Sequence, residues 1–596
     1  MKRYKFYTYL IISFLLMTSL SSPIIQGSPS QEYFFQVKII CESNTLTQNL
    51  ANYLKQELMR VKIDSIIYSY TSGLFEDKVI QKDFDIVLVE LEWPSVDPDP
   101  SVYFSSGGAG NYWGIAPSIS GGEANDELLS QALIEPDDEE RQALYADWQQ
   151  NLMNDILPVI PLYNTITTYC TWDTLSGWDH SLGLVESLPY MQWDSAHPGQ
   201  SNTSIFNDYV FDWDSLNPLF TRDNSVSRLF AEPLIQIDAY GDPQPFLAKD
   251  WEYLNNHTTL RLYLRNDVKW HVDEDNLFPN EYFSADDVLF SIKMYKHLST
   301  VGSFFQWVDS VTKINETTVE LVIDGAPNTP GLQYYAPCIT DLDQLILPEH
   351  YLNVSVDEET GLPDRTAGEW TKYADNGLGT GMYILDSYTE GTEASFRVNE
   401  DWWGKNASYI NEDLDIQRYT YQIRSDLFSI ENLRQEFEQG NIDVFKNYIK
   451  TLEEYTEPPY QAQSLSDRAI MVFGFNLQTT NTPELSDQEL CEDGTISKGL
   501  AVRKAIAHLV DKQTCADLLE VPSQIIHTPF SNRFSEYIST NVTQYEHDIP
   551  TAKEYMMKAG FNPETLTSDS LTFLLAISSL LFLGIIVILR DSKKNS

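Results

Sequence analysis

The sequence predicts an α/β protein with more than one domain, and three features support this prediction. Its 596 residues suffice for roughly two to four hydrophobic cores. Strand-like and helix-like segments alternate from residue 33 to residue 93, which is typical of a mostly parallel sheet covered by helices. A polar, turn-rich stretch at 194–204, DSAHPGQSNTS, is the best candidate for a linker between parts of the chain.

The alternation of strand-like and helix-like segments is clearest between residues 33 and 93. YFFQVKII (33–40), KIDSIIYSY (62–70) and FDIVLVELEW (84–93) have the apolar runs of strands. A helix is expected between the first two, because apolar residues recur there on one helical face. These residues are Leu46, Leu50, Leu54, Leu58 and Val61.

Later segments extend the same α/β pattern. A helix is expected at 137–155, where Asp137 and Asp138 favour the positive end of the helix dipole. ILPVIPLYN (156–164) is then expected to form a buried strand. SADDVLFSIKMYKHL (284–298) has a strong helix start, and ISKGLAVRKAIAHLVDKQTC (496–515) predicts one amphipathic helix.

Both ends of the chain carry long apolar segments. Basic residues followed by an apolar run and small residues predict a secretory signal peptide over residues 1–27. Residues 571–589 carry no charge, and at about 1.5 Å per residue they span roughly 28 Å, enough for a bilayer core. Since basic residues follow, we expect residues 590–596 in the cytoplasm and the ectodomain on the cell surface.

The chain is strongly acidic, with a formal net charge of −48 from 87 acidic and 39 basic side chains. This balance excludes nucleic acid as a partner, because phosphates require a basic surface. The charge favours a solvated acidic surface, and a preference for cationic ligands is the alternative.

The cysteines and histidines predict neither a disulfide framework nor a metal site. The five cysteines are scattered along the chain. A single disulfide is the alternative to free thiols, and Cys491 and Cys515 are the nearest pair in sequence. No HExxH or P-loop pattern occurs, and the nine histidines form no ligand-spaced pair, so we expect no enzyme and no cofactor. Six N-glycosylation sequons begin at Asn202, Asn256, Asn315, Asn353, Asn406 and Asn541.

Several motifs resemble one known family. Residues 245–292, PFLAKDWEYLNNHTTLRLYLRNDVKWHVDEDNLFPNEYFSADDVLFSI, resemble the signature region of family 5 extracellular solute-binding proteins, the peptide-, nickel- and oligosaccharide-binding receptors of ABC importers. GTGMYILDSYTEGTEASFRVNEDWWG (379–404) resembles the family's second landmark. Three further segments resemble later parts of the family and follow in its order: RQEFEQGNIDVF, FGFNLQ with VRKAIAHLVDKQTC, and TAKEYMMKAGF (551–561).

The order of the remaining elements differs from the family's. In the family, the second lobe continues after the last of these helices with elements similar to those at 33–93, and closes with elements similar to 137–163. The resemblance therefore implies a circularly permuted monomer, joined at 194–204 and opened between Glu564 and Tyr33. The alternative is a misassembled tandem gene whose halves pair with those of another chain.

The resemblance implies a two-lobed, class II periplasmic-binding-protein-like α/β fold, with an extra subdomain in the first lobe. Hinge crossings are expected near Gly474–Leu477 and Leu162–Thr167. The implied domains are the second lobe (33–165 and 475–564), the return to the first lobe with the linker (166–204), and the first lobe with its subdomain (205–474).

The implied function is capture of a small solute, such as a peptide, in a cleft that closes by hinge motion, followed by delivery to an ABC permease. The alternative is a surface sensor with the same fold that no longer serves transport. The candidate ligand residues are Trp93, Asp97, Tyr112 and Trp113.

Each candidate has a structural alternative. In peptide-binding members an Asp three residues after the Trp holds the ligand's amino group; here that position is Val96, and Asp97 follows it. Asp97 is either this anchor or a turn residue, and Trp93 either lines the pocket or packs in the core. Tyr112 and Trp113 are loop aromatics that could face the cleft, whereas Trp402 and Trp403 are expected in the core.

Overall fold

The computed structural model describes residues 33–565, except 94, 214, 222–223, 301, 303, 407–413, 425–429, 448–454 and 520. The predicted signal peptide, the apolar segment 571–589 and the tail 590–596 lie outside these residues. Within the described part of the chain, no helix has both the length and the apolar character needed to cross a membrane.

The chain forms two compact units. Unit 1 combines the N-terminal segment up to Val87 with residues 475–511 and the C-terminal segment from Tyr545. Unit 2 comprises residues 88–474 and 512–544. The predicted second-lobe segment 33–165 is therefore divided between the units, and the expected crossing near Gly474–Leu477 coincides with a passage of the chain from unit 2 to unit 1.

Unit 1 is built on parallel strands, as the alternation of segments predicts. β1 pairs along its whole length with β2, and Ile39 and Ile40 of β1 pair with the start of β3. Asn44 caps α2, and α2 packs its apolar face on β1 and β2. The elements are β1 Phe35–Glu42, α2 Thr45–Met59, β2 Ile63–Tyr70, α3 Ser72–Ile80, β3 Ile86–Glu92 (which continues into unit 2), η7 Pro483–Leu485, α12 Lys498–Ala507 and α14 Ile549–Lys558.

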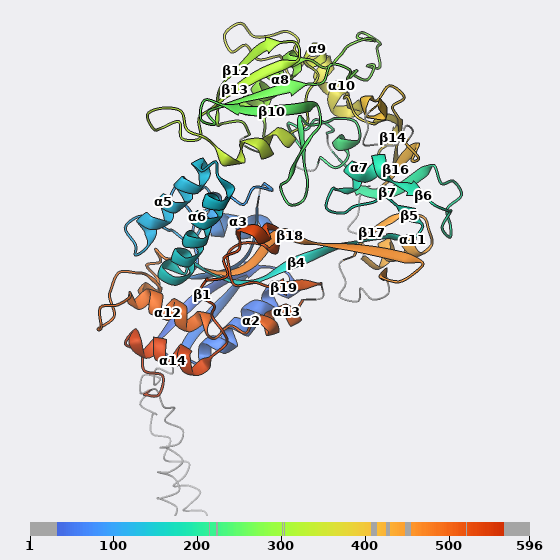
Figure 1. The fold of residues 1–596 in the computed structure, drawn as a ribbon. Coiled ribbons are helices and arrows are strands. Elements are labelled where there is room, and N and C mark those ends of the chain that lie inside the picture. The colour runs from blue at the N-terminus through green and yellow to red at the C-terminus, as the bar shows by residue number, and fades with distance from the viewer. Residues whose placement is uncertain are drawn as a thin grey trace, which may run out of the picture. The chain divides into compact units, whose positions relative to one another are not determined.

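The two ends of the described chain pack together in unit 1 (Figure 1, blue and red). Phe561, just after α14, lies with its ring 5.3 Å from the rings of both Phe34 and Phe35. The hydroxyl of Tyr53 in α2 accepts a hydrogen bond of 2.7 Å from the backbone N–H of Asp511. Phe34 and Phe35 thus help to complete the core around α14.

Polar contacts also join residues 38–85 to residues 476–482 in unit 1. We call the side chains that make them the seam: Asp85, Asn476, Thr479 and Thr482. The buried carboxylate of Asp85 accepts hydrogen bonds from the hydroxyls of Thr479 (2.5 Å) and Thr482 (2.9 Å) and from the backbone N–H of Lys38 (2.7 Å). The amide of Asn476 donates to the carbonyls of Lys82 and Phe84, each at 3.0 Å. Because every donor has an acceptor, the seam costs little desolvation energy.

The predicted helix at 496–515 is wrong as a single element. α12 ends at Ala507, and α13 begins at Lys512 in unit 2. The carbonyl of His508 accepts a hydrogen bond of 2.8 Å from the N–H of Asp548, at the start of α14, instead of continuing the helix. Leu509 and Val510 are buried in the resulting turn.

Among the residues that the structure describes, the strands of unit 2 form three larger paired groups and two short ribbons. β17, β18 and β19 all pair with β4, antiparallel. A second sheet has the order β10-β11-β13-β12 and a third the order β14-β15-β16-β7, while β5 pairs with β6 and β8 with β9. The strands are β4 Val159–Trp172, β5 Leu175–Ser176, β6 Gln192–Trp193, β7 Ile205–Phe211, β8 Ile235–Ile237, β9 Pro243–Pro245, β10 Ala248–Leu254, β11 Thr259–Leu264, β12 Val308–Asn315, β13 Thr318–Ile323, β14 Tyr383–Thr389, β15 Glu393–Val398, β16 Arg418–Arg424, β17 Val444–Asn447, β18 Tyr460–Phe475 and β19 Ser523–Ile525.

The helices of unit 2 confirm the predicted starts. Asp137 caps α6, and Ser284 with Asp287 forms a capping box on α8. The helices are α4 Ser101–Phe104, α5 Gly122–Ile134, α6 Asp138–Asn151, the π-helical η1 Leu152–Ile156, α7 Leu184–Ser187, η2 Leu188–Tyr190, η3 Ser227–Leu229, α8 Ala285–Leu298, η4 Ala336–Asp343, α9 Glu349–Leu352, α10 Gly368–Asn376, η5 Trp403–Asn406, α11 Ile430–Glu438, α13 Lys512–Asp517 and η8 Asn532–Tyr537.

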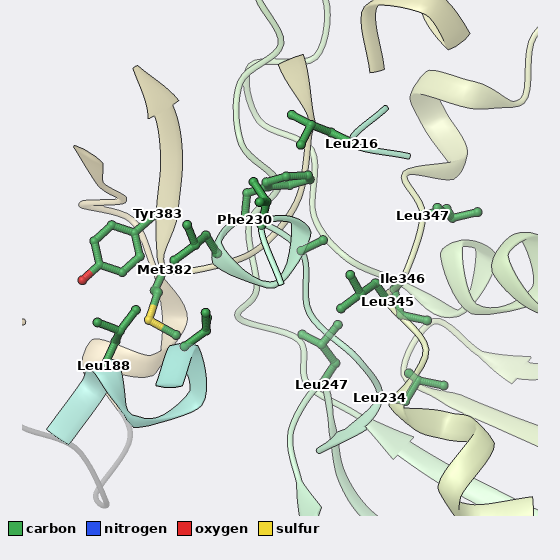
Figure 2. Packing of buried hydrophobic residues seen from close by; sticks show 14 of the residues in the cluster. Leu188, Leu216, Phe230, Leu234, Leu247, Leu345, Ile346, Leu347, Met382 and Tyr383 are labelled. Atoms are coloured by element: carbon green, nitrogen blue, oxygen red, sulfur yellow. The ribbon is translucent and has the colours of Figure 1, made fainter. Parts of the chain in front are cut away.

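One large hydrophobic cluster packs the part of unit 2 between Cys170 and Tyr455. Figure 2 shows Phe230 with Met382 and Leu188 on one side and Leu345 and Leu347 on the other. These side chains come from segments far apart in sequence, so the cluster ties most of unit 2 together.

The predicted linker at 194–204 is an ordered turn between β6 and β7. His197 lies fully buried, and its Nε2 lies 2.8 Å from a carboxylate oxygen of Asp443, which is also fully buried. The imidazole stacks on Trp172 at 4.5 Å. The turn-rich composition therefore marks a tight connection fastened to the core of unit 2.

The cysteines and sequons complete the description. All five cysteines are buried, and no disulfide joins Cys491 to Cys515. The asparagines of five sequons have exposed side chains: Asn202, Asn256, Asn315, Asn353 and Asn541. Asn406 lies at the end of η5.

Candidate functional site

Two long strands of unit 2 carry the candidate site. β4 and β18 pair from Val159 with Gly474 to Trp172 with Tyr460, but the register shifts between Ser466 and Ile470. Such a bulge inserts extra residues and redirects their side chains. The sequence gives no turn signal at this point, and its only mark is the charged pair Asp467–Arg468 in an otherwise uncharged strand.

The bulge is held by side chains from two other segments. Asn164 donates to the carbonyls of Asp467 (2.7 Å) and Ala469 (2.8 Å). The hydroxyl of Ser531 also donates to the carbonyl of Asp467. The bulge is therefore a fixed part of the fold, and the side chains of Asp467 and Arg468 line a cavity beside it.

This cavity, which we call the main cavity, has a volume of about 630 Å³. Its walls come from β4, β18, the end of β3, the segment 178–186 and parts of Arg228, Asp343, Lys446 and Arg533. A second space of about 1130 Å³ shares the main cavity's residues Glu92, Tyr169, Glu186, Arg228 and Arg468, so the two form one continuous site. The combined space is large enough for a small organic ligand.

An ion-pair group forms one wall. Arg228 contacts a carboxylate oxygen of Glu186 at 3.2 Å and one of Asp343 at 2.5 Å. Burial raises the pKa of both carboxyls, and the Arg228 guanidinium opposes that rise. The pKa of Arg228 is itself raised, because the two carboxylates outweigh the effect of burial.

Two further guanidinium groups also line the main cavity. Arg533 donates to the carbonyls of Ser466 (2.7 Å) and Ala239 (3.2 Å), and burial together with nearby Arg468 lowers its pKa to about 10. The side chain of Arg468 makes no hydrogen bond or ion pair with any residue that the structure describes. Burial lowers its pKa, although Glu92 and Asp343 act in the other direction. Arg468 is thus a partly buried cation with unused donors.

Two ring nitrogens that line the main cavity also have no hydrogen-bond partner among the described residues. The indole N–H of Trp178, which is 7% exposed, finds no acceptor among the described residues. Nε2 of His180 has no hydrogen-bond partner among the described residues either, and burial lowers the pKa of this imidazole to about 4, so it is neutral at pH 7. A buried polar group without a partner costs about 1–3 kcal/mol, which a ligand acceptor would recover.

The predicted aromatic residues lie together, around Tyr103. Its ring lies 5.9 Å from that of Trp93 and 6.3 Å from that of Tyr112, and Trp113 lies 6.0 Å from Tyr112. Trp93 and Trp113 are fully buried, and Tyr112 is half-buried. Trp93 lines the larger space next to the main cavity, whereas Trp113 packs against Gly474, where a Cβ atom would clash with its ring.

Asp97 is buried and already paired. Its two oxygens accept hydrogen bonds of 2.9 and 2.8 Å from the guanidinium of Arg141, and both side chains are about 5% exposed or less. Arg141 also donates to the hydroxyl of Tyr145 at 3.2 Å. In this arrangement the carboxylate holds the loop after β3 against α6.

Trp402 and Trp403 lie in the hydrophobic core, as predicted. Their indole N–H groups donate to the buried carboxylate of Glu232 at 2.7 and 2.8 Å. Sequence reasoning missed Trp178, Asp467, Arg468 and Arg533, because only the fold brings these residues to one cavity.

Among the described residues, no group of three or more His, Cys, Asp or Glu side chains is placed to hold a metal ion. The polar groups of the main cavity include carboxylates, guanidinium groups, the ammonium group of Lys446, hydroxyl groups and the indole N–H of Trp178. Such a set suits an organic ligand that carries charges of both signs.

Comparison with known proteins agrees in part with the resemblance. The dipeptide-binding protein of Escherichia coli (strain K12) is 26% identical over 174 residues, which cover 27% of this chain and 30% of that protein. The nickel-binding periplasmic protein of the same strain is 25% identical over 360 residues, covering 58% and 59%. The chain thus spans less than two thirds of the length of these relatives.

Among solved structures, HbpA2 from Haemophilus parasuis shares 18% identity, with a TM-score of 0.41, over 60% of this chain and 67% of that one. The model of bacterial extracellular solute-binding proteins, family 5 Middle, matches residues 242–580, more than half of the chain. The protein therefore belongs to family 5 of the bacterial extracellular solute-binding proteins.

Proposed function

We propose that this protein is the extracellular receptor of an ABC importer and captures a peptide, or a similar small solute with both charges, in the main cavity. Family membership supports a binding role without chemical conversion of the ligand. Similar proteins are named for a dipeptide, for nickel, and for oligopeptides in the case of AmiA of Streptococcus pneumoniae, which is 24% identical over 47% of this chain.

The observation that carries this proposal is the set of donors that line the main cavity and have no partner among the described residues. Arg468 and the indole N–H of Trp178 offer hydrogen bonds that no described residue accepts. A ligand carboxylate or carbonyl is the natural acceptor. Glu92 and Asp467, which also line the cavity, would attract the amino group of the same ligand.

Native mass spectrometry of the secreted protein tests the proposal directly. We expect small peptides to copurify, and the Arg468→Ala variant to lose most of them while remaining folded. Glu358→Gln, an exposed carboxylate elsewhere in unit 2, serves as the control. A protein that carries no peptide, and binds none in calorimetry with a dipeptide mixture, would contradict the proposal.

We further propose that ligand capture closes the protein about the expected hinges. The passage of the chain between units at Gly474, and the long strands β4 and β18, support this. Small-angle scattering should show a smaller radius of gyration with peptide than without it. An unchanged radius at saturating peptide would exclude closure.

Delivery to an ABC permease distinguishes an importer from a sensor. We expect cells that express the protein together with an ABC peptide permease to take up labelled peptide, and cells that express the permease alone to take up much less. Binding without any effect on uptake would instead support the sensor.

We propose that the order of the fold is circularly permuted within one chain. The packing of residues 33–87 with 475–511 and 545–565 in one unit supports this, and so does the fastened turn at 194–204. Light scattering should give the mass of a monomer. A stable dimer would mean that the segments complete each other between chains.

The location proposed from the sequence is a cell-surface ectodomain, released from a signal peptide at 1–27 and anchored by 571–589. Protease added to intact cells should digest the ectodomain and leave only the tail protected. Exposure of the sequon asparagines is compatible with glycosylation, and peptide-N-glycosidase treatment should then raise electrophoretic mobility.

A further inference from the structure

A separate cavity of unit 2 lies beside the main cavity and has a different chemistry. Its volume is about 570 Å³, and it shares only Val96 and Arg533 with the main cavity. Six aromatic residues line it, and we call it the aromatic cavity: Tyr240, Trp251, Tyr253, Tyr334, Phe534 and Tyr537.

These rings come from separate parts of the chain. Trp251 and Tyr253 lie on β10, Tyr537 lies at the end of η8, and Tyr334 precedes η4. The ring of Tyr334 meets that of Tyr253 edge to face at 5.7 Å. Tertiary folding therefore gathers aromatic faces around one space, and such faces attract cations.

The charges of the aromatic cavity are mainly negative. Asp138, Asp242 and Glu536 line it, and none of them forms an ion pair with a residue that the structure describes. Asp97 and Arg141, also in this wall, neutralise each other. Arg533 is then the remaining guanidinium, and its hydrogen bonds go to backbone carbonyls.

One wall of this cavity already accommodates a guanidinium on an aromatic ring. Arg141 lies 5.8 Å from the ring centre of Tyr537 and 5.3 Å from that of Tyr145. A ligand cation entering from the cavity side would meet the same kind of ring together with three carboxylates. The net charge of −48 would favour its approach.

We propose that the aromatic cavity is a subsite for the cationic group of a ligand, an alkylammonium or a guanidinium. This proposal rests on the proposed peptide-binding function, because the shared residues Val96 and Arg533 place the subsite next to the main cavity. A peptide held in the main cavity extends a lysine or arginine side chain into it. The receptor then selects basic peptides over neutral ones of the same size.

The test measures affinities of the full-length protein by calorimetry for Ala-Lys-Ala, Ala-norleucine-Ala and n-butylammonium chloride. The two peptides have similar side-chain length and differ in the ammonium group. We expect the lysine peptide to bind about tenfold more tightly, a ratio that corresponds to about 1.4 kcal/mol. The variant Asp138→Asn/Glu536→Gln should reduce this preference to less than threefold without changing affinity for the norleucine peptide.

The controls separate the subsite from the main cavity. Glu358→Gln removes an exposed carboxylate elsewhere in unit 2 and should leave the tenfold preference intact. Thermal unfolding verifies that each variant is folded, since Asp138 and Glu536 are exposed and their replacement removes little packing.

The outcomes distinguish the two proposals. Equal affinity for both peptides would overturn the cationic subsite and leave peptide capture standing. If neither peptide binds, peptide capture fails; butylammonium binding that the double variant abolishes would then assign the cavity to a free organic cation. Absence of butylammonium binding as well would overturn the subsite.

Discussion

The seam of unit 1 and the main cavity of unit 2 both bury polar groups, but they differ in how these groups are satisfied. In the seam, Asp85 accepts three hydrogen bonds from residues far apart in sequence. In the cavity wall, Arg468 and the N–H of Trp178 donate to none of the described residues. The first arrangement stabilises the fold, whereas the second leaves interaction energy for a ligand.

The comparison also shows that a place in a cavity does not make a residue a ligand contact. Asp97 lines the aromatic cavity, yet its carboxylate is occupied by Arg141 in the same way as that of Asp85 is occupied in the seam. Whether a polar group that lines a cavity can bind a ligand depends on how many hydrogen-bond or ion-pair partners the protein already gives it.

The largest expected effect follows from breaking the Asp97–Arg141 pair. Asp97→Asn leaves a buried guanidinium without its counter-ion, which costs about 4 kcal/mol of unfolding free energy. Urea denaturation measures this loss, with Asp147→Asn, an exposed position on α6, as control. Affinity of the folded variant for Ala-Ala-Ala should change less than threefold; a larger loss would mean that Asp97 anchors the ligand.

A pH-dependent effect is expected from Asp208, a buried carboxyl that lines the larger space and has no ion-pair partner among the described residues. Burial raises its pKa to about 7, although hydrogen bonds from Tyr419 and from the N–H of Tyr209 lower it. The folded state therefore binds the carboxyl proton of Asp208 more tightly than the unfolded state does. The free energy of unfolding should fall by about 3 kcal/mol as pH rises from about 4 to about 7.

Asp208→Asn should remove this contribution, because the amide stays neutral and the hydroxyl of Tyr419 can reverse its hydrogen bond. The measurement is the difference between the pH profiles of wild type and variant in urea denaturation. Parallel profiles from pH 4 to pH 8 would show that Asp208 titrates alike in the folded and unfolded states.

A smaller loss is expected in the seam. Asp85→Asn replaces one acceptor oxygen by an N–H₂ group, so one of the donors from Lys38, Thr479 or Thr482 loses its acceptor, at a cost of about 2 kcal/mol. Asp77→Asn, on the exposed face of α3, is the matched control. Chemical denaturation should show the loss of stability in Asp85→Asn alone. Equal stability of both variants would show that the hydrogen bonds of Asp85 do not stabilise unit 1.

The smallest effect concerns the cavity donor. Trp178→Phe removes the N–H and keeps an aromatic ring, so peptide affinity should weaken about fivefold, or about 1 kcal/mol, with little change in stability. Trp193→Phe is a close control, because that indole N–H also has no acceptor among the described residues but lies outside the cavity. Equal affinities of the two variants would contradict a ligand contact at Trp178.

The regular elements of unit 1 could be predicted because local patterns determine them. The apolar periodicity at 46–61 corresponds to α2, and the three apolar runs around it correspond to β1, β2 and β3. The break between α12 and α13 could not be predicted, since it depends on a hydrogen bond from Asp548, which lies some forty residues away in sequence.

The candidate site was less predictable for the same reason. Trp93, Tyr112 and Trp113 form one cluster, but their burial depends on Tyr103 and on packing that no local pattern reveals. The bulge at Asp467–Arg468 depends on Asn164 and Ser531, which lie on other segments. Charged residues in an apolar strand were the only available signal.

The packing of both chain ends in unit 1 has a consequence for the order of folding during synthesis. Residues 33–87 emerge first, but their partners at 475–511 and 545–565 emerge only after residues 88–474 have been made. At about 5–20 residues per second this delay is roughly 20–80 s. Throughout that interval β1 and α2 lack the contacts that they make with these later segments, such as those of Phe35 with Phe561 and of Tyr53 with Asp511. A chaperone that holds the nascent chain would therefore have its main task at these residues.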